Sequence, residues 1–421
     1  MAVKKIPISL LKVGMYITQL DISWIDSPFM YHHLKIKNAA QIDKLLKAGV
    51  KQLSIDTSKG VDVETPADVI RDKSSQETDK SQEDQAAKDK PVSEASAKEK
   101  LPERTSISQE LGVAKELKGK VEKLADEINE ALKNDKVVDA RQVSPLIDAT
   151  LSSLQRNNQA LAILINIQRK DASLANHTFA SFSLVLSISI KLSLGDDAQQ
   201  ALALAAFFHD TGWLKLPMHL LGKASPYTAS EKKLIYQHVS IGLRSLKQNC
   251  ELSSIVMRII TEHHEHLDGS GYPSGLKSDQ IHPLSKVFAV VVRYDELVHG
   301  LLDRPAVTPH GALANLYKEA KNEKLDEPSV SALISLLSVY PVGSAVQLSN
   351  KEKGIVLEID ADQPKLPVVK VVYDMAGMAH IKPKVINLAK IKTDKELSIT
   401  SVLDLTVPGA DPAQLLRVDL S

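Results

Sequence analysis

The spacing of apolar residues changes several times along the chain. Residues 1 to about 61 hold short apolar segments between glycines, which predicts a small mixed α/β module with a helix over 41–46 and a strand over 51–55. From 71 to 105 the chain is rich in charged and small polar residues and has no aromatic residue. Such a stretch buries too little apolar surface to offset its ordering entropy, so we expect a mobile linker there.

A long helical series follows the linker. One helix is predicted to begin near Ser108 and another near Val143, because apolar residues return there every three or four positions. In the second of these segments the apolar residues at helical spacing are Leu146, Leu151, Leu154, Leu161, Leu164 and Ile165. Breaks are expected at Gly195, at Gly212 and over the Gly- and Pro-rich stretch 268–275. This region holds the largest predicted core of the chain.

The pattern changes again near the end of the chain. From Tyr340 onward, short β-branched runs such as PVVKVVYD are separated by Asn, Gly and Pro, which is typical of short strands. The sequence therefore predicts a multidomain, mainly α-helical protein, which 421 residues with 43% apolar content can support. We expect a small α/β N-terminal module at 1–61, a disordered charged linker at 62–106, a connecting helix at 107–139, a helical domain at 140–335 and a β-rich C-terminal extension at 336–421.

Composition excludes several classes of function. The 52 basic residues balance the 52 acidic ones, so no overall field attracts a nucleic-acid polymer or an anionic membrane. A single cysteine, Cys250, can form neither an intrachain disulfide nor a multi-thiolate zinc site, and this favours a reducing compartment. No apolar run approaches the roughly 18 residues that span a bilayer, and the N-terminus has no clear secretory cleavage pattern. We therefore expect a cytoplasmic protein.

Histidines provide the candidate chemistry. Of the 13 in the chain, five recur at intervals of about 25 to 30 residues or as a pair within the helical region: His177, His209, His238, His263 and His264. Asp210 directly follows the second of them. Successive antiparallel helices can return such side chains to one place in a bundle. Imidazole and carboxylate are ligands of iron, manganese, nickel and zinc, and one carboxylate can bridge two ions that act on a phosphate ester.

Two sequence motifs make the resemblance to a known family specific. HDTGWLKLP resembles the signature of HD phosphohydrolases, and HHEHLDGSGYPSGL resembles that of the HD-GYP subfamily. His177 in ANHTFASFSL and His238 in YQHVSIGLRSL match the order and spacing of that family. The N-terminal IPISLLKVGMYITQLDISWIDSPF also resembles the domain of unknown function that often precedes bacterial HD-GYP domains. The resemblance implies an all-helical HD-type metal-binding bundle.

The implied activity is hydrolysis of cyclic di-GMP to pGpG or GMP at a di- or trinuclear metal centre. In this chain we expect one to two divalent ions, iron or manganese by preference. By analogy Asp210 would bridge them, with His177 and His209 on one ion and His238, His263 and His264 on the other. Asp210 and His209 would be the catalytic residues. Two adjacent helical residues point about 100° apart, so the doublet would approach its ion from two sides or lie at a helix end.

The resemblance also implies the residues that contact the substrate. Tyr272 and Gly271 of the second signature would line the substrate pocket, and Arg304 in LLDRPAV would contact phosphate or base. The tyrosine and basic neighbours that usually follow this arginine are missing here. Glu265 is expected either to orient a ligand imidazole or to be an exposed helix charge.

Two further departures from the family bear on activity. Trp213 stands where the family has a lysine that reaches the phosphate, and Lys215 is an alternative cation nearby. Trp213 itself would either pack in the core or stack on a guanine base. Val292 stands where the family has a metal-binding aspartate, and Asp295 is an alternative ligand three positions later. Restoring both residues, with Trp213→Lys and Val292→Asp, is expected to raise turnover.

Three functions remain open from the sequence. The first is a cyclic di-GMP phosphodiesterase of reduced activity. The second is a catalytically inactive receptor or adaptor for cyclic di-GMP or for GGDEF-domain proteins, and a homodimer is compatible with either. The third is a phosphohydrolase of another nucleotide, since the fold alone does not set the substrate. The intact HHEHLDGSGYPSGL signature favours cyclic di-GMP over the third.

Overall fold

The computed structural model divides into two compact units, Met1–Leu101 and Pro102–Ser421. The residues that it describes are 3–21, 34–36, 38–47, 49–57, 59–61, 104–167, 173–220, 227–300, 306–360, 362–391 and 397–404. Most of the predicted linker, residues 62–103, lies outside these ranges, as does Arg304. Within them, no helix combines the length and the apolar character that crossing a membrane requires.

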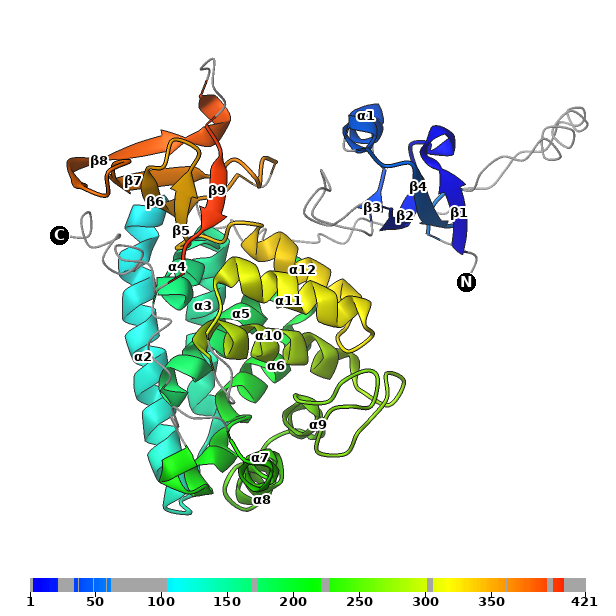
Figure 1. The fold of residues 1–421 in the computed structure, drawn as a ribbon. Coiled ribbons are helices and arrows are strands. Elements are labelled where there is room, and N and C mark those ends of the chain that lie inside the picture. The colour runs from blue at the N-terminus through cyan, green and yellow to red at the C-terminus, as the bar shows by residue number, and fades with distance from the viewer. Residues whose placement is uncertain are drawn as a thin grey trace, which may run out of the picture. The chain divides into compact units, whose positions relative to one another are not determined.

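The smaller unit is an antiparallel sheet with one helix (Figure 1). Its elements are β1 (Val3–Pro7), β2 (Tyr16–Leu20), β3 (Leu34–Lys35), α1 (Ala39–Lys47) and β4 (Gln52–Asp56), with the short 3₁₀ helix η1 (Ile8–Leu10) after β1. The strand order is β1-β4-β2-β3, so the last strand lies between the first two. Alternate residues of the strands, among them Ile6, Ile17, Leu53 and Ile55, form a buried aliphatic core.

The larger unit begins with a series of helices. They are α2 (Ile107–Lys133), α3 (Ser144–Arg156), α4 (Ala160–Ile167), α5 (Leu174–Lys191), α6 (Asp196–Phe208), α7 (Ala229–Tyr236), α8 (His238–Asn249), α9 (Ser254–Glu262), α10 (Pro283–His299), α11 (Pro309–Lys321) and α12 (Glu327–Leu337), with the 3₁₀ helices η2 (Ala140–Val143), η3 (Thr211–Lys215) and η4 (Met218–Leu220). In α5 every residue from Ala175 to Ser189 is buried. A helix that is buried all round is a central one, and α5 packs against α2, α3, α6, α10 and α12.

Helix α2 is the long helix along one side of the bundle in Figure 1. The Ser106 side chain accepts a hydrogen bond from Gln109 N–H, and the Gln109 side chain accepts one from Ser106 N–H, so a capping box starts the helix. One turn later Glu110 is buried and accepts hydrogen bonds from Arg156 and Ser153 on α3. The sequence suggests a connecting helix here, and in the structure it also packs against α3, α4 and α5.

A second antiparallel sheet follows the helices. Its strands are β5 (Ala345–Leu348), β6 (Lys353–Glu358), β7 (Val368–Tyr373), β8 (Ala379–Asn387) and β9 (Ile399–Val402), in the order β8-β7-β6-β5-β9, with the 3₁₀ helix η5 (Leu388–Lys390) after β8. The Gln159 side chain exchanges two hydrogen bonds with the backbone of Ile359, and Asn166 Nδ2 donates to Val342 O. These bonds join the sheet to the helices. The predicted fold class, mainly helical with a small α/β module before it and a β-rich extension after it, is confirmed.

Candidate metal centre and adjoining pocket

Helix ends bring the predicted histidines to one place. His177 lies in the first turn of α5, and His209 is the C-cap residue of α6 with Asp210 directly after it. His238 is the first residue of α8, and His263 is the C-cap residue of α9. The doublet therefore lies at a helix end, which is one of the two arrangements that the sequence allows.

Asp210 is the centre of the cluster. Its Oδ2 atom lies 3.2 Å from His177 Nε2 and 3.6 Å from His209 Nε2. Its Oδ1 atom lies 3.3 Å from His238 Nε2 and 3.8 Å from His263 Nε2. The two oxygens of one carboxylate thus face two different pairs of rings.

The donor atoms fall into two groups that share Asp210. One group is Asp210, His238, His263 and His264, and the other is His177, His209 and Asp210. Within each group the donor atoms all lie within 4.8 Å of one another. The arrangement brings together all six side chains that the sequence marks as candidate metal ligands.

Backbone carbonyls orient three of the rings. In each case Nδ1 bonds to the carbonyl oxygen three residues earlier, and the pairs are His209 with Ala206 at 3.1 Å, His238 with Ile235 at 2.8 Å and His263 with Ile260 at 2.7 Å. A carbonyl oxygen can only accept, so Nδ1 carries the proton and Nε2 presents its lone pair to Asp210. This arrangement is the one that metal-ligating histidines use.

A carboxylate orients the remaining ring on the Oδ2 side. His177 Nδ1 donates a hydrogen bond to Asp295 Oδ2. Asp295 Oδ1 lies 2.9 Å from His299 Nδ1, and His299 Nε2 is 3.3 Å from Asn176 Nδ2. Lys118 on α2 donates to Asn176 Oδ1 at 3.1 Å. A chain of buried polar side chains therefore leads from His177 to α2.

Gly212 allows η3 and α8 to approach closely. A Cβ atom at this position would lie 1.8 Å from the carbonyl oxygen of His238, far inside van der Waals contact. Any side chain here would push α8 away from η3. The glycine that follows Asp210 by two positions is therefore what lets His238 reach it.

The protonation states of His209, His263, His264 and Asp210 match those of metal ligands, and that of His177 differs. Burial lowers the pKa of His209 to about 4 and takes the pKa of His263 and His264 well below the usual value, so these rings are neutral at pH 7. Burial would raise the pKa of Asp210, but the surrounding imidazoles, above all His209, hold it well below its ordinary range. Burial would lower the pKa of His177, but Asp295 and Asp210 raise it to about 10.

These residues fit a divalent transition metal. Asp210 Oδ1 is buried and has no hydrogen-bond partner among the described residues, although two imidazole nitrogens lie within 4 Å of it. A buried carboxylate oxygen without a partner is costly unless a cation balances it. Neutral imidazole and ionised carboxylate are the forms in which these groups bind iron or manganese.

A pocket of about 280 Å³ adjoins the cluster. His263 and His264 line it, together with Gly271 and Tyr272 of the second signature. The Tyr272 ring stacks on His264, with 4.6 Å between ring centroids and 24° between planes. A Cβ atom on Gly271 would lie 2.3 Å from His266 N, so only glycine fits this part of the loop. Both signature residues that the sequence assigns to the substrate pocket therefore line this pocket.

Glu265 differs from both expectations drawn from the sequence. It is only 2% exposed, so it is not a surface charge. Its two carboxylate oxygens accept hydrogen bonds from the backbone N–H groups of Ser274 and Leu276, at 2.7 and 2.9 Å. Glu265 therefore holds the loop after the histidine doublet and does not orient a ligand ring. Helix α9 ends at Glu262, so Glu265 lies beyond the helix and not on one of its faces.

Trp213, one of the departures from the family, and the nearby Lys215 both have defined partners in the structure. Trp213 is 7% exposed, packs with Leu216 and Ile235, and stacks on the His238 ring with centroids 5.3 Å apart. It therefore fills core space beside a candidate ligand. Lys215 donates to Asp135 and to the carbonyl of Lys133. Its ammonium group is bound there, on a different face of η3.

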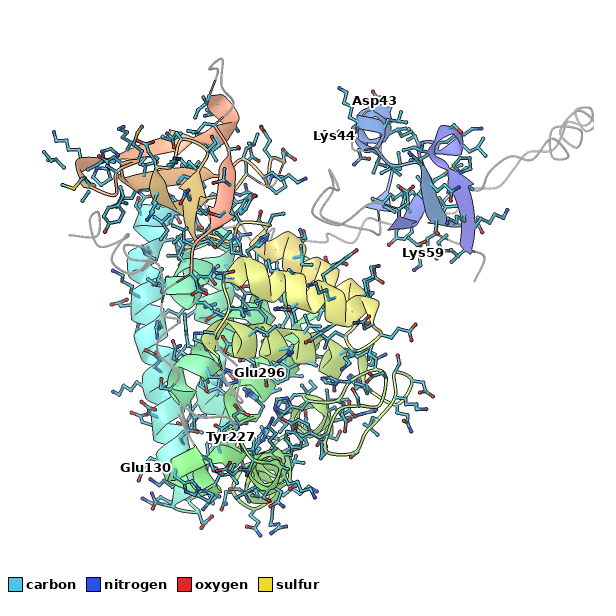
Figure 2. The ribbon with its side chains drawn as sticks, viewed as in Figure 1. Asp43, Lys44, Lys59, Glu130, Tyr227 and Glu296 are labelled. Atoms are coloured by element: carbon cyan, nitrogen blue, oxygen red, sulfur yellow. The ribbon has the colours of Figure 1, made fainter. Side chains whose placement is uncertain are left out.

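Sequence reasoning missed several buried polar residues. His299 and Asn176 continue the contacts of Asp295, and Glu296 lies in the interior of the helical unit, where Figure 2 labels it. A detectable signal is the spacing of Asp295 and His299, which are four residues apart and so share one face of α10. No motif marks Asn176 or Glu296.

Comparison with known families gives three adjacent matches. Residues 3–143 match a domain of unknown function (DUF3391), residues 141–328 match an HD domain, and residues 345–406 match a KOW domain associated with HD domains. The second match contains every residue of the cluster, and the third contains strands β5 to β9.

Individual relatives agree with these matches. The chain is 28% identical over 395 residues to the cyclic di-GMP phosphodiesterase PA4108 of Pseudomonas aeruginosa, which covers 93% of this chain and 91% of the relative. It is 32% identical over 149 residues to the cyclic di-GMP phosphodiesterase response regulator RpfG of Xanthomonas campestris, which covers 35% of this chain and 39% of the relative.

A solved structure of Bd1817, an HDG"Y"P protein from Bdellovibrio bacteriovorus, superposes with a TM-score of 0.45 at 18% identity, covering 80% of this chain and 99% of that one. The three family matches together extend over most of the chain: the first two overlap at 141–143, and residues 329–344 separate the second from the third. Residues 141–328 are thus an HD domain that carries the HD-GYP signature, and this domain lies between a match to DUF3391 and a match to a KOW domain associated with HD domains.

Proposed function

We propose that the protein is a metal-dependent phosphodiesterase that hydrolyses cyclic di-GMP to pGpG or GMP. The observation that carries the proposal is the position of Asp210 between two sets of imidazoles beside a pocket walled by Tyr272. Relatives named cyclic di-GMP phosphodiesterases support the substrate, and one of them matches over 93% of this chain.

The donor set supports one position for each of two ions. His177, His209 and Asp210 would hold one ion, and Asp210, His238, His263 and His264 would hold the other. When bound, such ions activate water and neutralise charge on phosphoryl oxygens, and iron or manganese suits these ligands. The side chains contribute orientation, because the backbone carbonyls and Asp295 fix the ring planes before metal or substrate arrives.

The pocket has the chemistry that a cyclic dinucleotide requires. Tyr227, Tyr236 and Tyr272 line it. Tyr272 is already stacked against His264 and Tyr236, so Tyr227 and Tyr236 are the rings on which a purine base can stack. Tyr236 and Tyr272 are themselves stacked, with centroids 4.0 Å apart. Lys232 and Lys324 also line the pocket and can pair with phosphate oxygens. The reaction adds water across one P–O3′ bond and leaves a 5′-phosphate and a 3′-hydroxyl.

Turnover is expected to be slow. Trp213 removes a cation from the phosphate, and Val292 offers no ligand to the ion beside His177 and His209. Each loss can cost several kcal/mol of transition-state stabilisation, and about 1.4 kcal/mol corresponds to a tenfold change in rate. The presence of Trp213 and Val292 also favours a second candidate function, a receptor that binds cyclic di-GMP without cleaving it.

Product analysis separates the two functions. The purified full-length chain is incubated with cyclic di-GMP and Mn²⁺ or Fe²⁺ under reducing conditions, with cyclic di-AMP and 3′3′-cGAMP as alternative substrates. An enzyme forms pGpG or GMP, and Asp210→Asn abolishes the product, whereas the exposed control Asp148→Asn does not. Tight binding of cyclic di-GMP with no product over days would support the receptor and refute the phosphodiesterase.

A further inference from the structure

Glu296 is a buried carboxylate next to the candidate metal centre. It lies on α10 one helical turn after Val292, and residues four apart share a face of a helix. Its side chain is 7% exposed and, like His263 and His264, lines the pocket. This residue therefore places a carboxylate at the edge of the cluster, one turn from the position where a carboxylate is missing.

The two oxygens of Glu296 have different surroundings. Oε2 accepts a hydrogen bond from Arg293 Nη1 at 3.1 Å. Oε1 is buried and has no hydrogen-bond partner among the described residues. His264 Nδ1 lies 3.6 Å from Oε1, which is too long for a hydrogen bond. Oε2 is thus fixed by the guanidinium of Arg293. Oε1 points toward the candidate ligand His264 and has no hydrogen-bond partner among the described residues.

Arg293 holds Glu296 in this orientation. Its guanidinium makes a two-point contact with Glu319, with Nε 2.9 Å from Oε2 and Nη2 2.6 Å from Oε1. The same group contacts Glu296 through Nη1. A guanidinium fixed on two sides leaves little freedom to the carboxylate that it binds. The position of the unpartnered oxygen is therefore set by a network outside the cluster.

His264 differs from the other candidate ligand rings in the group that its Nδ1 atom faces. Nδ1 of His209, His238 and His263 bonds to a backbone carbonyl, and Nδ1 of His177 bonds to Asp295. Nδ1 of His264 instead faces Glu296 Oε1. A ring nitrogen and a carboxylate oxygen that face each other at this distance without a hydrogen bond can share a cation between them.

We propose that Glu296 Oε1 is an additional carboxylate ligand on the side of the centre formed by Asp210, His238, His263 and His264. The inference rests on the proposed metal centre, and it assigns to Glu296 part of the negative charge that Val292 does not supply. A buried carboxylate oxygen that lacks a donor is stabilised by such a cation.

Metal titration of the metal-free protein tests the proposal without reference to turnover. Mn²⁺ binding is measured by calorimetry at pH 7, and the spectrum of bound Mn²⁺ by electron paramagnetic resonance, for the wild type and Glu296→Gln. We expect the amide to weaken Mn²⁺ binding about tenfold or more and to change the spectrum. Glu319→Gln is the matched control, because Glu319 contacts the same Arg293 but makes no hydrogen bond or ion pair with a candidate ligand, and this variant should bind Mn²⁺ within about threefold of the wild type.

A relocated carboxylate gives a second arm. Val292→Asp combined with Glu296→Ala moves the carboxylate back by one helical turn, to the position assigned to the ion beside His177 and His209, so we expect it not to recover the Mn²⁺ affinity that Glu296→Ala alone loses. Full recovery would contradict the assignment of Glu296 to the side formed by Asp210, His238, His263 and His264. If thermal unfolding shows that this variant does not fold, the comparison of Glu296→Gln with Glu319→Gln still tests whether Glu296 is a ligand. Wild-type affinity and an unchanged spectrum in Glu296→Gln would overturn the proposal, since glutamine can still bond to Arg293 and His264. A wild type that binds no Mn²⁺ would refute the proposed metal centre instead.

Discussion

Asp295 accepts a hydrogen bond from Nδ1 of His177, and this contact directs Nε2 of the same ring to within 3.2 Å of Asp210. The other oxygen of Asp295 lies 2.9 Å from His299 Nδ1. Both oxygens are therefore engaged by imidazoles. Asp295 orients a candidate ligand, and this use explains why it does not replace the ligand missing at Val292.

Asp295→Asn should weaken metal binding without unfolding the protein. The amide keeps the shape of the side chain but loses the charge that fixes the His177 ring, and such a change behind a ligand typically costs about 10- to 100-fold in metal affinity or activity. Calorimetric titration with Mn²⁺ measures the effect, and the exposed Asp148→Asn is the control. Equal affinities for the two variants would show that Asp295 has no part in orienting His177.

Glu265→Ala should affect nucleotide binding and leave metal binding unchanged. The carboxylate holds the loop that carries Tyr272 by two hydrogen bonds from backbone N–H groups, and bonds to a charged group are worth about 1.5–3 kcal/mol each. We expect KM, or Kd for cyclic di-GMP, to rise at least tenfold, a change of about 1.4 kcal/mol. A loss of Mn²⁺ affinity with unchanged nucleotide binding would place Glu265 on a ligand ring instead.

Trp213→Lys should destabilise the protein rather than restore activity, contrary to what the sequence alone suggests. The indole is buried among Leu216, Leu220 and Ile235 and stacks on His238, so lysine would leave a cavity and bury a charge. We expect the free energy of unfolding to fall by about 3 kcal/mol or more. Trp213→Phe, which keeps a ring over His238, is the control. Chemical denaturation checks the difference, and wild-type stability of Trp213→Lys would show that the indole is not needed for packing.

The stability supplied by Glu110 should depend on pH. Hydrogen bonds from Arg156, in spite of burial, lower the pKa of Glu110 below its ordinary value. Its contribution is therefore fully present above the pKa of glutamate in the unfolded chain and is lost as the pH falls through the lower folded-state pKa. Glu110→Gln should lower the melting temperature at pH 7 and converge with the wild type in acid. Glu116→Gln, on the exposed face of the same helix, should match the wild type throughout. A pH-independent gap between Glu110→Gln and the wild type would contradict this account.

The architecture could be predicted from the sequence because the spacing of apolar residues differs between the helical part and the β-rich parts. The helical series, the short strands after Tyr340 and the family resemblance are all confirmed. The boundaries of the domains, the ligand roles and the contact of Arg304 stay predictions, and Arg304 lies outside the described residues. The sequence showed the β-rich extension but not its match to a KOW domain.

The residues that sequence reasoning misjudged depend on where helices end and on what lies across the bundle. The sequence leaves Glu265 either beside a ligand imidazole or as an exposed helix charge, but α9 ends at Glu262, and the Glu265 side chain turns toward the loop. The sequence leaves Asp295 open as a replacement ligand, and only the packing of α10 against α5 shows that it faces Nδ1 of His177. Nothing in the sequence marks Glu296, because a buried oxygen without a hydrogen-bond partner has no sequence signature.

Anomalous diffraction from crystals of the Mn²⁺-loaded protein tests the metal centre most directly. We predict one peak beside Asp210 Oδ1, against His238, His263 and His264, and a second beside Oδ2, against His177 and His209. An anomalous map from fully loaded protein with no peak at Asp210 would contradict the metal centre and, with it, the proposed hydrolysis.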